Sequence, residues 1–322
     1  MNKPNLFNFA TSELSQDAFI CWLLSWAKPC YKTSHPQLNA CATDILRVCF
    51  EKHECEFPSE IQSVEISKQD VNIDVLCVVN GLFAVLIEDK THTSQHSDQL
   101  QRYFDGVRNR GFAAGNILPI YFKTRDQSNY GPVTAAGYQP FLRGDLLAIL
   151  NQYESVDSDI FQDFRACLNE VEYEVQSFRR LPLQEWKWNS WIGFYVEMKK
   201  AFPDGNWDYV ANPSGGFLGF WFSWHQNAYL QLEQEKFCFK IEVDDREQQS
   251  SERQQWHEAI LSAGTAAGFN LRKPDRFGLG SYMTVCVLNE EYRKTKDGVL
   301  DFEATIELIG RISAMLKMVR LA

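Results

Sequence analysis

The feature that most constrains the fold is a pair of apolar segments joined by the dipeptide Asn80-Gly81. The flanking segments, residues 71–79 and 82–90, are rich in Val, Ile, Leu and Phe, residue types that favour β-strands. Asn-Gly readily adopts the left-handed conformations that a two-residue hairpin turn requires. The sequence therefore predicts an antiparallel hairpin, preceded by a weaker strand over residues 61–68.

Helices and further strands surround the predicted hairpin. Apolar residues repeat with helical spacing on both sides of it, and Gly111 is a suitable stop for the helix that follows. A strand, a crossover helix and a second strand imply a right-handed parallel connection, so a mixed sheet is expected. The predicted helices cover residues 12–27, 38–52, 94–110 and 144–152, and the predicted strands beyond the hairpin cover residues 116–122 and 138–142.

The length of 322 residues exceeds the roughly 100–200 residues of one typical domain, so two domains are expected. Arg179–Pro182 is the best linker candidate, which gives an α/β domain over residues 1–178 and a smaller α+β domain over residues 183–322. The later helices are predicted over residues 160–177, 186–202, 251–268 and 302–320, and the later strands over residues 207–211, 216–224, 228–233, 237–243 and 282–288.

The composition restricts the class of protein. The net charge of −10 excludes a generally basic nucleic-acid-binding surface, so contacts with nucleic acid would need a local basic surface, a metal or a partner. No apolar run approaches the ~18 residues of a membrane span, and the N-terminus does not resemble a signal peptide. The nine cysteines are scattered without a Cys-x-x-Cys pair, which is typical of reduced core cysteines in a cytoplasmic protein.

Charged residues interrupt the hairpin near its open end. Because side chains alternate along a strand, Glu88 and Lys90 share one face and Asp89 points to the other. The turn brings Asp74 level with Glu88. Two neighbouring carboxylates favour a hard cation such as Mg²⁺ or Mn²⁺, and a lysine beside them can hold and polarise a water molecule. Each residue alone is better explained by an ordinary ion pair, but the combination predicts a site for phosphodiester hydrolysis.

The helix after the hairpin carries Gln99 and Tyr103 one turn apart, and hence on one face. This helix must pack back on the sheet, so Gln99 can reach the end of the strand that carries Glu88. The alternative is that Tyr103 belongs to the core and Gln99 to the surface.

Asp74, the tripeptide Glu88-Asp-Lys90 and the spacing Gln99-x-x-x-Tyr103 resemble the PD-(D/E)XK nuclease superfamily. More narrowly, they are similar to its QxxxY branch, which includes RecB-type and lambda-exonuclease-type nucleases. Ile73 stands where that superfamily often has proline. The resemblance implies a restriction-endonuclease-like αβββαβ core. It also implies that Asp74, Glu88 and the backbone carbonyl of Asp89 bind metal, that Lys90 orients the attacking water, that Gln99 and Tyr103 position the site, and that Glu13, supported by Asp17, completes it.

The function that this resemblance implies is that of a nuclease dependent on Mg²⁺ or Mn²⁺, cutting DNA in preference to RNA. Prokaryotic defence or repair is the expected setting, and a protein partner or a second copy of the chain is a candidate associate; no membrane is involved. Two other classes stay open. One is a catalytically silent binding or assembly protein on the same fold, and the other is a metal-free hydrolase with paired carboxylates. The latter leaves Lys90 and Gln99 without a role.

Three weaker patterns remain. His92 and His96 have the spacing of a metal-ligand pair, although polar loop contacts explain them better. Basic side chains are candidates for phosphate contacts, although each one singly is better explained as part of a solvated helix face: Arg102, Arg108, Arg110, Lys123, Arg125 and Arg143. Aromatic residues in the second half favour a β core over base stacking: Trp207, Phe217, Phe220, Trp221, Phe222 and Trp224.

Overall fold

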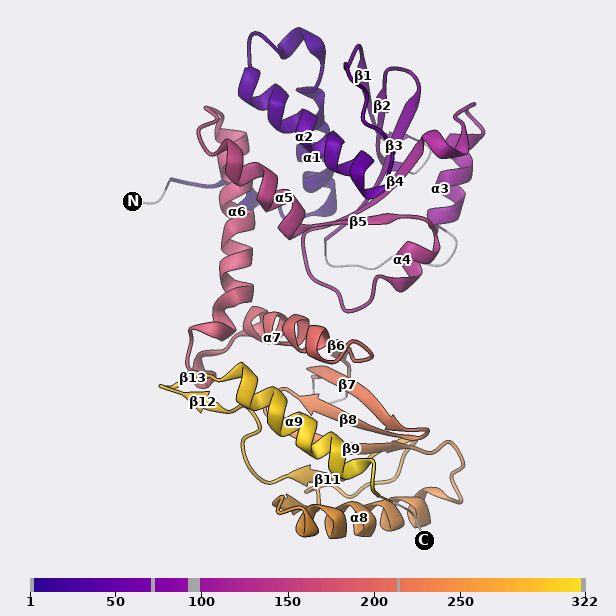
Figure 1. Ribbon diagram of the computed structural model, residues 1–322, viewed down its shortest axis with the longest axis vertical. Coiled ribbons are helices and arrows are strands. Elements are labelled where there is room, and N and C mark those ends of the chain that lie inside the picture. Colours follow the sequence, from indigo (N-terminus) through magenta and orange to yellow (C-terminus); the bar gives the residue numbers. More distant parts are fainter. Residues whose placement is uncertain (1–2, 71–72, 92–98, 213–214, 320–322) are drawn as a thin grey trace. The chain divides into compact units, whose positions relative to one another are not determined.

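The computed structural model describes residues 3–70, 73–91, 99–212 and 215–319 (Figure 1). The chain divides into two compact units, Met1–Glu172 and Tyr173–Ala322. The division falls within helix α6 (Asp159–Val175), ahead of the expected linker at residues 179–182. Each unit has its own sheet, so each is described separately below.

The first unit is built on a mixed five-stranded sheet with the order β1-β2-β3-β4-β5. The first three strands pair antiparallel, whereas β4 runs parallel to β3 and β5 runs parallel to β4. The expected mixed α/β sheet is therefore confirmed. The strands are β1 (Val64–Asp70), β2 (Ile73–Val79), β3 (Phe83–Lys90), β4 (Ile117–Lys123) and β5 (Gln139–Leu142).

The turn between β2 and β3 has the conformation that its sequence predicts. Asn80 and Gly81 have φ angles of 56° and 65°, both in the left-handed region. The Asn80 side chain also accepts hydrogen bonds from the backbone N–H groups of Gln62 and Ser63 at 2.7 and 3.1 Å. Asn80 therefore fixes the hairpin turn and ties it to the segment that leads into β1.

Different helices cover the two faces of this sheet. Val85 and Ile87 of β3 lie in an apolar cluster with α1 and α2, whereas Ala84 and Leu86 lie in a cluster with α3. Buried even-numbered and odd-numbered positions of β3 thus face opposite helical layers. The helices of the unit are α1 (Glu13–Ser25), α2 (Pro36–Lys52), α3 (Gln99–Arg108), α4 (Gly131–Ala135), α5 (Arg143–Leu150) and α6.

The second unit contains a six-stranded sheet with the order β10-β11-β9-β8-β7-β6, in which every pair is antiparallel. Side chains from α7, α8 and α9 join one face of this sheet in a single apolar cluster, and the α+β class is as expected. The elements are α7 (Trp188–Ala201), β6 (Asn206–Val210), β7 (Phe217–His225), β8 (Ala228–Glu233), β9 (Lys236–Glu242), α8 (Gln249–Ala266), β10 (Leu271–Arg272), β11 (Tyr282–Leu288), β12 (Thr295–Lys296), β13 (Val299–Leu300) and α9 (Phe302–Leu316).

The shortest elements are the ones that sequence patterning misses. Helix α4 and strands β10, β12 and β13 span too few residues to display a period of 2.0 or 3.6. Short 3-10 turns fall in the same group: Leu6–Asn8, Pro29–Tyr31, Ala114–Asn116, Asn151–Tyr153, Gln176–Arg179 and Leu183–Glu185.

The nine cysteines are all free thiols, and Cys41, Cys49 and Cys77 are fully buried in the first core. Over the described ranges, none of the helices combines the length and apolar character needed to cross a bilayer.

Candidate active site

The hairpin register sets Asp74 beside the end of β3. Val75 pairs with Ile87, so the next position along β2, Asp74, lies opposite Glu88. The Asp74 carboxylate accepts a hydrogen bond from the backbone N–H of Asp89 at 2.9 Å. Asp74 is thereby held against the strand end that carries the other charged residues.

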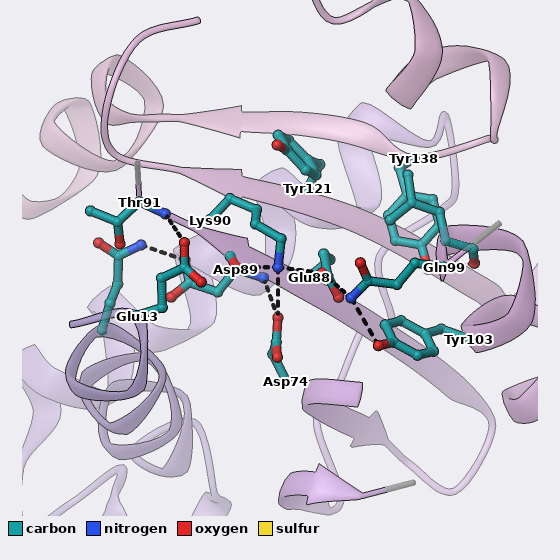
Figure 2. Close-up of polar contacts among 12 residues, drawn as sticks. Glu13, Asp74, Glu88, Asp89, Lys90, Thr91, Gln99, Tyr103, Tyr121 and Tyr138 are labelled. Atoms are coloured by element: carbon teal, nitrogen blue, oxygen red, sulfur yellow. Dashed lines mark hydrogen bonds and ion pairs between the residues drawn. The ribbon is translucent and has the colours of Figure 1, made fainter. Parts of the chain in front are cut away.

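The ammonium group of Lys90 lies among three oxygen atoms (Figure 2). Its Nζ is 2.5 Å from Glu88 Oε1, 3.2 Å from the backbone oxygen of Asp89 and 3.9 Å from Asp74 Oδ2. These are the three groups that the sequence resemblance assigns to a metal ion. In this structure they converge on a positive charge, which here is the lysine itself.

A bound cation would stabilise the Glu88 carboxylate. Burial, and after it the negative charge of Asp74, raises the pKa of Glu88 to about 7, although Lys90 acts in the opposite direction. Its Oε2 is buried and has no hydrogen-bond partner among the described residues. A divalent cation would satisfy this oxygen and relieve the repulsion from Asp74.

The donor set fits a hard cation. Within the described ranges no three His, Cys, Asp or Glu side chains converge on one point, so a metal here would take two carboxylates and one backbone carbonyl. Oxygen ligands of this kind, completed by water, suit Mg²⁺ or Mn²⁺.

Helix α3 adds two side chains to the same face of the sheet (Figure 2). Gln99 Nε2 lies 2.8 Å from Glu88 Oε1 and 2.8 Å from the hydroxyl oxygen of Tyr103, and it donates to both. The hydroxyl of Tyr138 donates in turn to the backbone oxygen of Leu100 at 3.0 Å, which anchors the start of α3. Gln99 on α3 therefore orients the Glu88 carboxylate at the end of β3.

Glu13, the first residue of α1, reaches the end of β3 from the opposite helical layer. Its carboxylate accepts a hydrogen bond from the backbone N–H of Thr91 at 3.0 Å. Burial tends to lower the pKa of Lys90, but the hydrogen bond that its ammonium donates to Glu88 and the charges of Glu88, Asp74 and Glu13 outweigh burial, so the pKa of Lys90 is raised. Lys90 therefore keeps its positive charge among these carboxylates.

On the far face of β3, the Asp89 side chain points toward α1, as the strand alternation predicts. It accepts a hydrogen bond from Gln16 Nε2, and Gln16 Oε1 accepts one from the Thr124 hydroxyl at 2.6 Å. Asp17 lies beside Asp89, and burial raises the pKa of Asp17 to about 6 and that of Asp89 well above its usual value. This network joins α1 to the ends of β3 and β4.

Lys123, one of the basic residues that the sequence offers as candidates for phosphate contacts, lies at the site. It ends β4 in register with Lys90, it is buried, and its Nζ donates to the backbone oxygen of Thr91 at 3.1 Å. Burial lowers the pKa of Lys123 to about 8. Its one sequence signal is a lysine directly after an apolar segment, whereas Lys90 follows the acidic residues Glu88 and Asp89.

Other candidates take different places. Arg143 is buried and forms ion pairs with Asp126 at 2.7 Å and Glu172 at 2.8 Å, so it stabilises the unit and is no exposed phosphate contact. His92 and His96 lie outside the described residues. Among the aromatic candidates, Trp207, Phe220 and Phe222 are buried in the core of the second unit.

Together, the mixed αβββαβ sheet and the charged residues at its strand ends define an α/β protein with a restriction-endonuclease-like core. The family model of the PD-(D/E)XK nuclease superfamily matches residues 4–179, more than half of the chain. The chain therefore belongs to the PD-(D/E)XK nuclease superfamily, and the expected superfamily and fold class are confirmed. Among curated proteins and solved structures, no significant match to the chain is found.

Proposed function

We propose that the protein is a nuclease that hydrolyses phosphodiester bonds with the help of Mg²⁺ or Mn²⁺. The observation that carries the proposal is the convergence of Glu88 Oε1, the Asp89 carbonyl and Asp74 Oδ2 on one positive charge. The superfamily to which the chain belongs consists generally of nucleases, which supports the same reaction.

Asp74, Glu88 and the backbone carbonyl of Asp89 would hold the metal. When bound, the metal supplies charge stabilisation at the phosphate and promotes ionisation of water. Asp74 is fixed by the backbone N–H of Asp89, and Glu88 by the Gln99 amide, so both carboxylates are oriented before substrate arrives.

Lys90 has the second chemical role in this proposal. Its ammonium remains charged at neutral pH, and it orients the attacking water and offsets negative charge as the phosphate is attacked. Glu13 steadies the strand end through the Thr91 N–H, on the side away from Gln99. Gln99 and Tyr103 act as positioning residues, which is the arrangement that gives the QxxxY branch its name.

The substrate proposed for this reaction is DNA in preference to RNA, with prokaryotic defence or repair as the setting in the cytoplasm. The similarity of Gln99-x-x-x-Tyr103 to the spacing in RecB-type and lambda-exonuclease-type nucleases supports this choice. The net charge of −10 favours a nuclease that a partner or a second copy of the chain delivers to its substrate. A catalytically silent binding protein is the competing function, and the intact set of Asp74, Glu88 and Lys90 speaks against it.

Cleavage of circular single-stranded DNA and linear double-stranded DNA, with Mg²⁺ or Mn²⁺, tests the proposal. We expect metal-dependent cutting by the wild-type chain and by a control with the exposed lysine of the same unit replaced, Lys32→Ala. Lys90→Ala is expected to lose at least ~100-fold in rate, as for removal of a charge-stabilising group. Cutting that survives in Lys90→Ala, or a wild-type chain that neither cuts nor melts at a higher temperature with metal, would overturn it.

A further inference from the structure

In the described part of the second unit, α7, α8 and α9 pack in an apolar cluster against one face of the sheet, and the other face lies outside this cluster. Along β7, Leu218, Phe220 and Phe222 point into the apolar cluster with α7, α8 and α9. Because side chains alternate, Phe217 and Trp221 point to the other face. The aromatic segment of β7 is thus divided between a core and a second surface.

A cavity of about 930 Å³ opens on that second face. Its volume falls in the range of ~300–1,000 Å³ that is usual for pockets that bind small molecules. Rings from three strands line it, together with an amide and the guanidinium of a loop residue: Phe217, Trp221, Tyr229, Tyr282, Gln231 and Arg276.

Gln231 is a polar residue of this cavity whose amide group is available to a ligand. Gln231 is 5% exposed as a whole residue, and its side chain lines the cavity. No described residue forms a hydrogen bond with its amide group. Its amide opens onto the cavity and is not sealed from solvent, so it offers two donors and one acceptor to a ligand there. Gly219 leaves room for it, because a Cβ atom there would lie 3.0 Å from Gln231 Nε2.

A flat ring lies directly beside this amide. Trp221 on β7 is the cross-strand partner of Gln231 on β8, and Tyr229 is the next residue of β8 on the same face. Aromatic rings stack on nucleobases, and a glutamine amide can both donate to and accept from the edge of a base, most characteristically adenine. Ring and amide together are the two elements by which proteins read an unpaired base.

The charged residues that line the cavity include one exposed cation that can contact a phosphodiester. Lys240 is paired with Glu233 at 3.0 Å, and Glu242 adds a further negative charge. Among the described residues that line the cavity, Arg276 is the cation without an ion pair, and it is exposed. One guanidinium suits the single charge of a phosphate within a strand, whereas a free nucleotide carries more charge in the same space.

We infer that this cavity binds an unpaired base of the nucleic-acid substrate, with the base stacked on Trp221 and hydrogen-bonded to Gln231 and with the adjacent phosphate bound by Arg276. The choice of a strand as the ligand rests on the proposed function. The second unit then recognises single-stranded or extruded bases, whereas the first unit carries out the chemistry.

Binding measurements on the full chain without divalent metal test this inference. The probe is a fluorescent single strand of deoxyadenosine of about 12 nucleotides, within the ~4–16 nucleotides of typical single-strand sites, and its comparison is the same strand with abasic positions. We expect the wild-type chain to bind the strand with bases more tightly than the abasic one. This comparison needs no variant, so it does not depend on a variant's folding.

The variants locate the effect. Trp221→Ala is expected to weaken binding of the strand with bases by about 5- to 150-fold, the range for losing one base–aromatic stack. Gln231→Met keeps the side-chain volume and is expected to reduce the preference for adenine over the other bases. Trp188→Ala removes an exposed ring elsewhere in the unit and is the matched control, with wild-type affinity expected.

Each contrary result has a distinct meaning. Equal affinity for the abasic strand, or unchanged affinity in Trp221→Ala, overturns the base site. Adenosine monophosphate that binds as tightly as the strand overturns the assignment to a strand and identifies a free nucleotide instead. If the chain cuts DNA but its binding does not depend on the bases, this inference is wrong and the proposed nuclease function stands. If binding depends on the bases and on Trp221 but the chain does not cut, the base site is supported and the proposed nuclease function is wrong.

Discussion

The Lys90 ammonium lies 2.5 Å from Glu88 Oε1, and the two residues occupy the same face of β3. Glu88 is fully buried and Lys90 nearly so, and therefore each charge depends on the other. Removing one partner of a buried ion pair commonly costs ~3–5 kcal/mol, because the remaining charge loses its compensation. Lys90 thus compensates the carboxylate charges at the strand end when no metal is present. This predicts that a bound metal can replace the ammonium in that role, with a measurable effect on stability.

The variant Lys90→Met tests whether a metal can replace the lysine charge. Without metal, we expect the variant to be less stable than the wild-type chain by ~3–5 kcal/mol, since Glu88 and Asp74 then face each other without the ammonium. Mg²⁺ should restore part of this loss, so the rise in melting temperature on adding Mg²⁺ should be larger in Lys90→Met than in the wild-type chain. A rise no larger than that of the wild type would contradict a shared cation position.

Glu88→Gln should remove the metal response itself. The substitution keeps the shape of the side chain but replaces its buried, unpartnered Oε2 with an amide group that does not ligate a cation as strongly. A metal present at 100 times its Kd stabilises the wild-type chain by ~2.7 kcal/mol, and we expect most of this to vanish in the variant. Glu65→Gln, on the exposed side of β1, is the control and should respond like the wild type.

Asp89→Asn separates the backbone of Asp89 from its side chain. The carboxyl group faces Gln16 and Asp17, whereas the carbonyl faces Lys90. We therefore expect the variant to keep the metal-induced rise in melting temperature and to cut within ~10-fold of the wild-type rate, while Asp74→Asn loses both. Loss of the metal response in Asp89→Asn would mean that the side chain, and not the carbonyl, is the ligand.

The turn and the strand alternation made this part of the site predictable from sequence. Asn80-Gly81 fixes the register of β2 against β3, and that register alone sets Asp74 beside Glu88 and turns Asp89 away. The helical spacing of Gln99 and Tyr103 then predicts the α3 contribution. These relationships are local or depend on a single turn, so the turn residues and the side-chain periodicity are sufficient to predict them.

Contacts between distant segments were not predictable in this way. Lys123 reaches the site because β4 pairs with β3 in one particular parallel register, which no local pattern encodes. The contact of Gln16 with Asp89 requires the packing of α1 on the sheet. In the second unit, alternation divides Phe220 from Trp221, but which face the helices cover is settled only by packing of the whole unit.

Substitutions on α3 should rank the two positioning residues. Gln99→Ala removes a hydrogen bond to the charged Glu88, and such bonds contribute ~1.5–3 kcal/mol, so we expect kcat/KM to fall by about 10- to 150-fold. Tyr103→Phe removes only a bond between neutral groups, worth ~0.5–1.5 kcal/mol, and should lower kcat/KM by about 2- to 12-fold. Gln101→Ala, exposed on the same helix, should leave the rate unchanged, and a larger effect of Tyr103→Phe than of Gln99→Ala would refute this order.

Lys123 predicts a dependence of stability on pH. Its pKa is lowered from 10.5 to about 8, so between those values the unfolded chain binds more protons at this position than the folded chain does. Stability contributed by this group therefore rises as pH increases from about 8 to 10.5, and the cost of burying the charged lysine, ~3 kcal/mol, is fully present below pH 8. Measured by chemical unfolding without metal, the stability of Lys123→Met relative to the wild type should be greatest at pH 7 and should decline steadily toward pH 10. The comparison concerns this change and not the absolute stability, because the variant also loses the hydrogen bond to Thr91 at every pH. A difference that stays constant across the range would show that Lys123 keeps an ordinary pKa despite its burial.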